Sequence, residues 1–238
     1  MLVSIVVPAH NEEENLPLLA ERLVQMLRRS RLPAEVILVD DNSTDSTPQV
    51  CDRIAKKHPL VRALHRRGER GMGNALKEGT LAARGSIVIW TMADLSDDVE
   101  AIPRFVEEIR DGADMVFGSR YMEGGSPGDL SRVKAFSSKA VSLLAAVGIG
   151  IPVRDITNAF RGFRKEVFHA ARPRAGDFAI SPEFALKAHL RGFRLGEVPV
   201  TYKNRVKGVQ KFRMYRMGKR YARILAQACL ARAGLVDF

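Results

Sequence analysis

The amino-acid sequence predicts an α/β fold built on a mostly parallel, twisted sheet with helices on its faces. Short apolar runs rich in β-branched residues begin the chain and recur along it, without the apolar–polar alternation of half-exposed strands. Each run is followed by a polar loop and then by a segment with helical spacing of its apolar residues. Such repeats form right-handed crossovers between parallel strands, so we expect a Rossmann-like sheet.

The first hundred residues supply four of the expected strands. These are Leu2–Val7, Ala34–Val39, Val61–Leu64 and Ile87–Trp90. The helices between them are expected at 16–27, 48–57 and 75–83. Asn11 is a preferred residue type for the N-cap of the first helix, whose apolar face begins at Leu16.

The second half of the chain continues the pattern less regularly. We expect helices at 99–110, 131–150 and 183–190, and strands at 115–121 and 196–202. The glycine-rich loop 123–128 is a candidate lid, because glycine permits large backbone excursions. Segment 153–164 is polar yet aromatic, which is unusual for a surface loop and predicts the wall of a pocket.

Acidic side chains follow several of the expected strands. Glu12 comes after the first strand, Asp40 and Asp41 after the second, and Asp94 after the fourth. The carboxyl ends of parallel strands meet at one edge of a sheet, where α/β proteins bind ligands. A carboxylate there can hold a divalent cation against a diphosphate. The alternative is that the acids of 94–98 merely cap the next helix, but convergence of acids from several strands favours a site.

Several classes of protein do not fit this sequence. A dinucleotide-binding domain needs a glycine-rich turn directly after its first strand, and here that turn is acidic and lacks glycine. No stretch reaches the ~18 uncharged apolar residues of a spanning helix, and 140–153, which comes nearest, is predicted to be a core or interfacial helix. The N-terminus lacks a basic region, so we expect no signal peptide. Cys51 and Cys229 lie far apart, which suggests a reducing compartment.

The net charge of +11 is concentrated near the C-terminus, since residues 198–236 contain no acid. The bases of this region are Lys203, Arg205, Lys207, Lys211, Arg213, Arg216, Lys219, Arg220, Arg223 and Arg232. Such segregation predicts an anionic partner. On a helical wheel, 213–231 separates a Met- and Tyr-containing face from a basic face, as in a helix lying on an anionic bilayer. An ordinary surface helix packed on the core is the alternative. We expect no nucleic-acid partner, because stacking aromatics are not interleaved with the bases.

Seven segments of the chain together match a known family. They are IVVPAHNEEENL (5–16), ILVDDNSTDST (37–47), RGMGNALKEG (70–79), ADLSDD (93–98), VFGSRYMEGG (116–125), DITNAFRGFRKEVF (155–168) and EVPVTYKNRVKGVQKF (197–212). In this order they resemble family-2 glycosyltransferases of the GT-A fold, and among these the dolichyl- or polyprenyl-phosphate mannose synthases. The resemblance implies a catalytic domain over 1–212, followed by a basic amphipathic helix over 213–238.

The resemblance also implies roles for individual residues. Pro8, His10 (usually Tyr in the family), Glu12 and Asp40 would border the base and ribose of a nucleotide sugar, with Asp41, Arg70 and Gly73 near the nucleotide. Asp94 would hold Mg²⁺ or Mn²⁺ at the diphosphate. Arg120, Lys134 and Ser137 would face the lipid phosphate, and Arg205 and Lys211 would close over the phosphates.

The implied reaction moves a hexose, most simply mannose from GDP-mannose, onto a polyprenyl phosphate with inversion at the anomeric carbon. The lipid phosphate is already anionic, so positioning and electrostatic stabilisation suffice without a general base. The implied partners are the nucleotide sugar, polyprenyl phosphate, an anionic membrane surface and a membrane protein. We therefore expect a cytoplasmic protein held peripherally at the inner face of the membrane.

Two departures from the family pattern keep alternatives open. Met92 replaces the first acid of the usual Asp-Ala-Asp-Leu-Gln, and Ser96 replaces its Gln, which removes two oxygen ligands from the expected metal shell. Relatives often end in transmembrane helices that this chain lacks. The alternatives are a family-2 enzyme using UDP-glucose or a soluble acceptor, and a catalytically inactive binding module.

Overall fold

A seven-stranded sheet forms the centre of the protein, in the order β3-β2-β1-β4-β6-β5-β7. The computed structural model describes residues 1–207 and 214–238, the side chains of 214–216 excepted. The strands are β1 (Val3–Ala9), β2 (Ala34–Asp40), β3 (Val61–His65), β4 (Ile87–Trp90), β5 (Met115–Ser119), β6 (Arg161–Arg164) and β7 (Leu195–Pro199). β6 is antiparallel to its neighbours β4 and β5, and the remaining pairings are parallel. The predicted, mostly parallel α/β sheet is confirmed.

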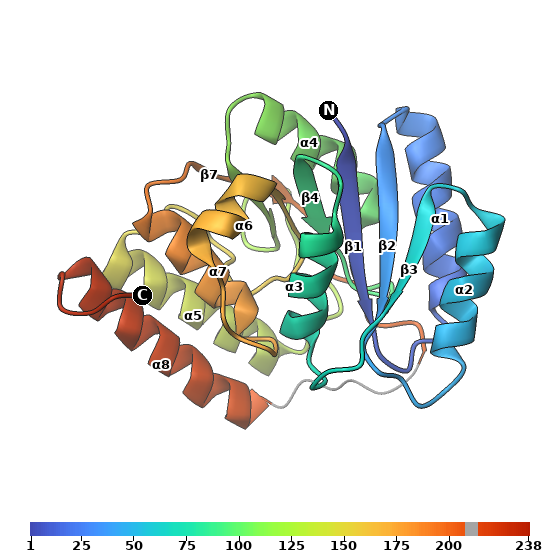
Figure 1. Cartoon of the computed structure of the whole chain (residues 1–238). Coiled ribbons are helices and arrows are strands. Elements are labelled where there is room, and N and C mark those ends of the chain that lie inside the picture. The colour runs from blue at the N-terminus through green and yellow to red at the C-terminus, as the bar shows by residue number, and fades with distance from the viewer. Residues whose placement is uncertain (208–213) are drawn as a thin grey trace.

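Helices cover both faces of this sheet. They are α1 (Leu16–Ser30), α2 (Thr47–Lys57), α3 (Met72–Ala82), the 3₁₀ turn η1 (Val99–Ala101), α4 (Ile102–Arg110), α5 (Arg132–Ile149), α6 (Lys165–Ala171), α7 (Ile180–Leu190) and α8 (Met214–Arg232). One core cluster joins the sheet to α1, α2 and α4, and the other joins it to α3 and α5–α8. In Figure 1, α8 lies beside α5 and α7, at the end of the molecule away from α1 and α2.

The structure differs from the expected local structure at β6 and at the start of α1. The segment 153–164, expected to be a pocket wall, also contains the strand β6, which was not expected because its sequence RGFR lacks the β-branched residues of a buried strand. Asn11 is not the N-cap of α1: the helix begins at Leu16, and Asn11 has φ 53°. Its side-chain oxygen instead accepts a hydrogen bond from the Thr44 backbone N–H at 2.9 Å, which ties the loop after β1 to the loop after β2.

The apolar face of α8 packs inside the protein. Met217, Tyr221, Ile224 and Ala228 are at most 8% exposed and belong to the core cluster shared with α7. These residues are on the face that the sequence suggested would meet a bilayer. That expectation is wrong, because the second core cluster needs the same apolar surface for its own burial. The predicted boundary between 212 and 213 falls within the residues that are not described.

Four aromatic rings form the centre of this second cluster. Trp90 lies edge-on to Phe163, with ring centroids 5.1 Å apart, and is 5.3 Å from Phe184, while Phe184 is 5.8 Å from Phe168. Offset and edge-to-face contacts of this kind add to the free energy gained from burial. The Trp90 indole N–H also donates to Thr80 Oγ1 at 2.9 Å, so its one polar atom is satisfied inside the core. The end of β4 is thus fixed from the α3 and α7 side.

We predict that Phe184→Ala lowers the free energy of unfolding by about 3–5 kcal/mol, because it opens a cavity among three other rings. Urea denaturation followed by circular dichroism measures this loss. Leu81→Ala is the control: Leu81 is 59% exposed on α3, and its truncation should change stability by less than about 0.5 kcal/mol. Equal, small effects of both substitutions would contradict the assignment of this core.

Candidate active site

Loops from most of the sheet meet at one edge. β1, β2, β4, β5 and β7 all end there, and antiparallel β6 begins there. Asn11, Asn42 and Leu95 follow β1, β2 and β4, and all three have positive φ, a conformation that costs energy in residues other than glycine. The neighbouring strands β1 and β4 lie where the chain order of the sheet reverses, which is the usual ligand position in open α/β sheets.

The first cavity at this edge, here called the β1 pocket, has a volume of about 270 Å³. Seven of the predicted site residues line it: Pro8, His10, Glu12, Asp41, Arg70, Asp94 and Arg205. They come from the end of β1, from the loops after β1, β2, β3 and β4, and from the segment after β7. The His10 Nδ1 lies 3.1 Å from the Asp41 carbonyl oxygen, so the loops after β1 and β2 touch at the mouth of the pocket.

The second cavity, here called the α5 pocket, has a volume of about 250 Å³. It contains all three residues expected to face a lipid phosphate: Arg120, Lys134 and Ser137. Lys134 and Ser137 lie on α5, and Arg120 directly follows β5. Met92, Asp94 and Phe178 line both cavities, so the two pockets adjoin at the end of β4. Two ligands bound in them would meet at Asp94.

The loop carrying Asp94 is held by short-range hydrogen bonds. The Asp94 carboxylate accepts from the Ser96 backbone N–H at 3.1 Å. Its backbone carbonyl accepts from Val206 N–H at 3.3 Å, and the Ser96 carbonyl accepts from Lys203 N–H at 3.1 Å. The segment after β7 therefore crosses directly over the loop after β4. This fixes the Asp94 side chain between the two cavities.

Asp97 is a further carboxyl group in the α5 pocket. It accepts hydrogen bonds from Met92 N–H at 2.8 Å and Thr91 Oγ1 at 3.1 Å. Burial raises its pKa to about 7, against these bonds, because a charged carboxylate is poorly solvated there. Asp97 thus fixes the backbone at Met92, the position where the family usually has an acid.

The residues at this edge could hold a divalent cation only if a bound substrate supplied further oxygen ligands. Among the residues that the structure describes, no three acidic, histidine or cysteine side chains converge to hold an ion. Mg²⁺ is commonly held by one or two carboxylates together with substrate phosphates and water. Asp94 lies where a diphosphate in the β1 pocket would need such an ion. It would be the protein ligand, and the ion would neutralise charge on the leaving diphosphate.

Arg120 is fixed by a buried carboxylate. Its Nε and Nη2 donate to the two oxygens of Asp155 at 2.7 and 2.9 Å, and Nη2 also donates to Thr157 Oγ1 at 3.0 Å. Asp155 is 0% exposed and Arg120 is 8% exposed. A bidentate pair of this kind holds the guanidinium plane in one orientation at the wall of the α5 pocket. The sequence motif around Asp155 suggested a pocket wall but not this partner.

A second buried arginine braces the same wall. Arg161 is 0% exposed and donates to the backbone carbonyls of Ser181 at 2.8 Å and Ile156 at 3.3 Å, and also to that of Asn158. Burial lowers its pKa to about 9. Asn158 and Ser181 both line the α5 pocket, so Arg161 joins two of its sides from behind.

Arg205 pairs with Glu12 across the β1 pocket. Its Nη2 lies 2.8 and 3.0 Å from the two carboxylate oxygens of Glu12. The Asn15 side chain donates both to Glu12 at 2.6 Å and to the Lys207 carbonyl at 3.1 Å. The chain after β7 is therefore fastened to the loop after β1, and Arg205 reaches the pocket as expected.

Two of the predicted residues, Asp40 and Gly73, do not line either pocket. The Asp40 carboxylate accepts from Ser43 N–H at 3.1 Å, which shapes the turn after β2. A Cβ at Gly73 would lie 2.5 Å from the Ala175 carbonyl oxygen, so this glycine permits close packing of 175–177 on α3. Both positions shape the backbone around the site, and their contact with a nucleotide stays a prediction. Lys211 lies outside the described residues.

The segment 172–178 supplies residues that the sequence reasoning missed. Asp177 lines the β1 pocket, and Phe178 lines both pockets. Glu183, at the start of α7, accepts from the backbone N–H groups of Arg174 at 2.8 Å and Ala175 at 2.7 Å. The segment has no strand or helix pattern, and its single acid, Asp177, carries no motif that would identify it as a site residue.

Comparison with curated proteins finds relatives across most of the chain. A dolichol-phosphate mannosyltransferase of Pyrococcus furiosus is 32% identical over 90% of this chain and 60% of that protein. A polyprenol monophosphomannose synthase of Mycolicibacterium smegmatis is 30% identical over 87% of this chain and 79% of that protein. The chain thus spans about 60% of the length of the archaeal relative.

Among solved structures, the glucosyl-3-phosphoglycerate synthase of Mycobacterium tuberculosis superposes with a TM-score of 0.73, at 19% identity, over 99% of this chain and 81% of that one. At that identity the likeness shows the fold alone. The profile of glycosyl transferase family 2 matches residues 4–171. The chain belongs to glycosyl transferase family 2.

Proposed function

We propose that the chain transfers a hexose from a nucleotide diphosphate sugar to a polyprenyl phosphate at a membrane surface, with inversion at the anomeric carbon. The observation that carries this proposal is the meeting of two pockets at Asp94, one with the predicted nucleotide-sugar residues and one with Arg120, Lys134 and Ser137. The β1 pocket takes the donor and the α5 pocket takes the acceptor phosphate. The two relatives, a dolichol-phosphate mannosyltransferase and a polyprenol monophosphomannose synthase, support a polyprenyl phosphate acceptor.

GDP-mannose is the donor we favour. The relatives at 30–32% identity over most of the chain include two mannosyltransferases. Structures of the mycobacterial synthase hold UDP with Mg²⁺ or Mn²⁺, but they are only 19% identical to this chain. UDP-glucose is therefore the second candidate. By the same family comparison, Mg²⁺ or Mn²⁺ is the expected cation beside Asp94.

The proposed chemistry is a direct displacement between two anionic groups. The acceptor phosphate is ionised at neutral pH, so it attacks without losing a proton to the protein. Arg120, fixed by Asp155, offsets the charge of the incoming phosphate, and Arg205 lies on the donor side. A cation at Asp94 would stabilise the leaving diphosphate when bound. The protein contributes mainly position and electrostatic stabilisation.

The helix α5, which lines the proposed acceptor pocket, also carries an exposed apolar surface. Val133, Phe136, Leu143, Leu144 and Val147 on α5 are between 59% and 78% exposed. They lie on one side of the helix, opposite the buried Ser142, Ala145 and Ile149. Single exposed apolar residues are common, but a continuous stripe of this size marks an interaction surface. Since α5 also carries Lys134 and Ser137, we assign this face to the bilayer that holds the acceptor lipid.

This assignment moves the proposed membrane contact from α8 to α5. Among the described residues, no helix is both long and apolar enough to cross a bilayer. The α5 stripe with the basic residues Arg132 and Lys139 beside it suits a peripheral helix on anionic lipid. We propose attachment to the cytoplasmic, inner face of the membrane, where nucleotide sugars are available, with or without a membrane-protein partner.

Transfer of labelled sugar from GDP-mannose or UDP-glucose to polyprenyl phosphate in vesicles tests the function. We predict lipid-linked product that is lost in EDTA, and a fall of about 10²–10³ in kcat for Asp94→Ala, because the leaving diphosphate loses its cation. Asp98→Ala is the control, since Asp98 lines neither pocket. Equal rates for the two variants would exclude the role given to Asp94.

The same assay separates the alternative functions. Transfer only to water-soluble acceptors would favour a family-2 enzyme with a soluble acceptor. Donor binding without turnover would favour a catalytically inactive binding module.

For Arg120→Lys we predict a rise of about tenfold or more in KM for polyprenyl phosphate, because lysine cannot reproduce the bidentate geometry. The KM for the nucleotide sugar should stay within twofold, since Arg120 does not line the β1 pocket. Steady-state kinetics with each substrate varied in turn measures both constants. A selective rise in the KM for the nucleotide sugar would contradict the assignment of Arg120 to the acceptor phosphate.

The triple variant Phe136→Ser, Leu143→Ser, Val147→Ser should bind vesicles at least tenfold more weakly, because it removes buried apolar area from the bilayer contact. Leu18→Ser with Leu81→Ser is the matched control, since these leucines are 49% and 59% exposed on α1 and α3. Co-sedimentation with anionic vesicles measures binding. Vesicle binding that survives the triple substitution would refute the assignment of the α5 face.

A further inference from the structure

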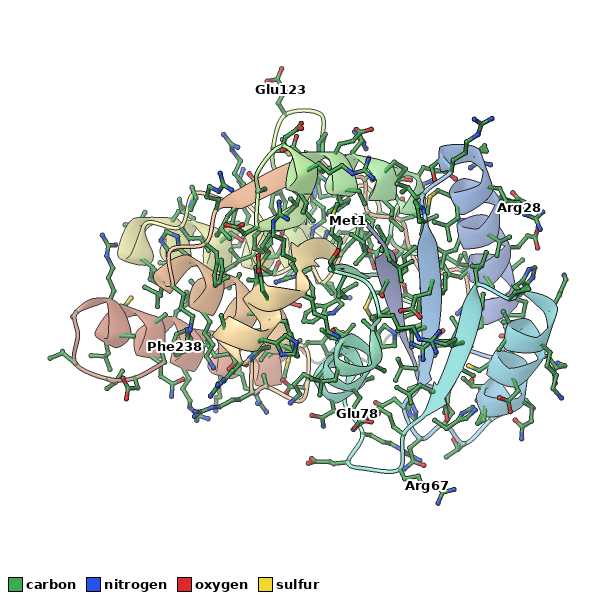
Figure 2. The ribbon with its side chains drawn as sticks, turned by 45° about the horizontal axis from the view of Figure 1, so that its top comes forward. Met1, Arg28, Arg67, Glu78, Glu123 and Phe238 are labelled. Carbon is green, nitrogen blue, oxygen red and sulfur yellow. The ribbon has the colours of Figure 1, made fainter. Side chains whose placement is uncertain are left out.

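A third cavity of about 320 Å³ lies between α7, α8 and the segment 174–176, away from the two pockets of the active site. We call it the α7–α8 cleft. Four basic side chains line it, Arg174, Lys187, Arg220 and Arg223, against the two acids Glu183 and Asp237. Gln227 and Phe238 complete the lining used below. Figure 2 labels Phe238 at this side of the molecule, far from Arg28 on α1.

Two of these four cations are already neutralised. Lys187 Nζ lies 2.6 Å from Glu183, whose carboxylate also accepts the two backbone N–H groups of the segment 174–176. Arg220 pairs with Asp177 at 3.0 Å. The Phe238 backbone oxygen accepts from Arg191, and its ring lies 5.3 Å from the Lys187 ammonium. Glu183 is thus already paired with Lys187 and two backbone N–H groups, which leaves Asp237 as the other acid of the cleft beside Arg174 and Arg223.

The guanidinium groups of Arg174 and Arg223 make no ion pair or hydrogen bond that the described part of the chain displays. Exposed arginines are ordinarily solvated, and a pair of them on a convex surface would not indicate an anion-binding site. Here they belong to one concave cavity, on opposite elements, with the amide of Gln227 as a further donor. Two guanidinium forks that line one cavity can match the oxygens of a phosphate group.

The cleft lies directly behind the wall of the active site. Arg174, Ala175 and Gly176 line the cleft, and the next two residues, Asp177 and Phe178, line the donor and acceptor pockets. The same backbone packs closely on Gly71 and Gly73, where an added Cβ would lie 2.1 and 2.5 Å from carbonyl oxygens. An anion joining Arg174 to Arg223 would tie this wall to α8, beside the existing Asp177–Arg220 pair.

We propose that the α7–α8 cleft binds a phosphate-class anion, either a free phosphate ester or the headgroup of an anionic lipid, and that the bound anion fixes the segment 174–178. Fixing this segment lowers the entropy that donor binding must otherwise remove, so the anion strengthens donor binding. Binding of the anion stands on the cleft alone. Its effect on the donor rests on the proposed function.

Titration with inorganic phosphate and with glycerol 3-phosphate, followed by calorimetry, tests the site. We predict that Arg174→Gln with Arg223→Gln weakens binding at least tenfold, because both unpaired forks are lost. The charge-matched control, Arg28→Gln with Arg53→Gln on α1 and α2, should bind like the unmodified chain. Hydrogen exchange of the peptides covering 172–179 and 220–227 should slow on anion addition in the unmodified chain and stay unchanged in the cleft variant. Equal affinities and exchange in all three proteins would overturn the proposal.

Vesicles of phosphatidylglycerol and of phosphatidylcholine separate the two sources of the anion. A headgroup ligand predicts slowed exchange at 172–179 on phosphatidylglycerol alone and loss of this effect in the cleft variant. A free phosphate ester predicts the effect with glycerol 3-phosphate and no change with either vesicle. Either result supports the site, and slowed exchange on both vesicles alike, undiminished in the cleft variant, would refute it.

The effect on the donor is measured separately as the KM for the nucleotide sugar with and without the anion. A severalfold decrease in the unmodified chain that is absent in the cleft variant is expected. An unchanged KM with a filled cleft would refute the coupling. Absence of any sugar transfer would instead count against the proposed function, because the titration and exchange results do not depend on transfer.

Discussion

The arrangement of the active site depends on one constraint, the common direction of the strands. Because β1, β2, β4, β5 and β7 run parallel, their carboxyl ends bring loops distant in sequence to one edge. Antiparallel β6 adds to this edge the loop that precedes it, with Asp155 and Asn158. The reversal at β6 is thus what places a buried carboxylate behind Arg120. The aromatic cluster around Trp90 holds the end of β4, and with it Asp94, in register with these loops.

Fixed ion pairs surround both pockets at this edge. Around the β1 pocket, Glu12 pairs with Arg205 and Asp41 with Arg66. Around the α5 pocket, Arg120 is oriented by Asp155, while Arg161 is buried behind the wall and bonded to backbone carbonyls. If the α5 pocket takes the acceptor phosphate as proposed, the fixed Arg120 suits a reaction whose main obstacle is the approach of one anion to another. Groups already fixed in the free protein need little rearrangement when the substrates arrive.

The sequence patterns predict the parallel part of the fold closely and the rest poorly, for physical reasons. Ile87–Trp90 is a strand as predicted, because a β-branched run buried on both faces has few other options. The strand β6, with the sequence RGFR, forms because it pairs with β4 and β5, so its own residues do not identify it as a strand. The α8 wheel indicates an apolar face but cannot tell a bilayer from a protein core, and Met217, Tyr221 and Ile224 on that face are buried. Asp40 and Gly73 carry family motifs yet act on the backbone, and Asp177 and Phe178 are placed by tertiary packing alone.

The central claim is that donor and acceptor occupy adjoining pockets at the same time and react directly across Asp94. Initial rates of sugar transfer, measured while the nucleotide sugar and the polyprenyl phosphate are both varied, test it most directly. Two filled pockets predict a sequential mechanism, with double-reciprocal lines that intersect, and a product of inverted anomeric configuration. Parallel lines with retained configuration would indicate a glycosylated protein intermediate and would contradict the account.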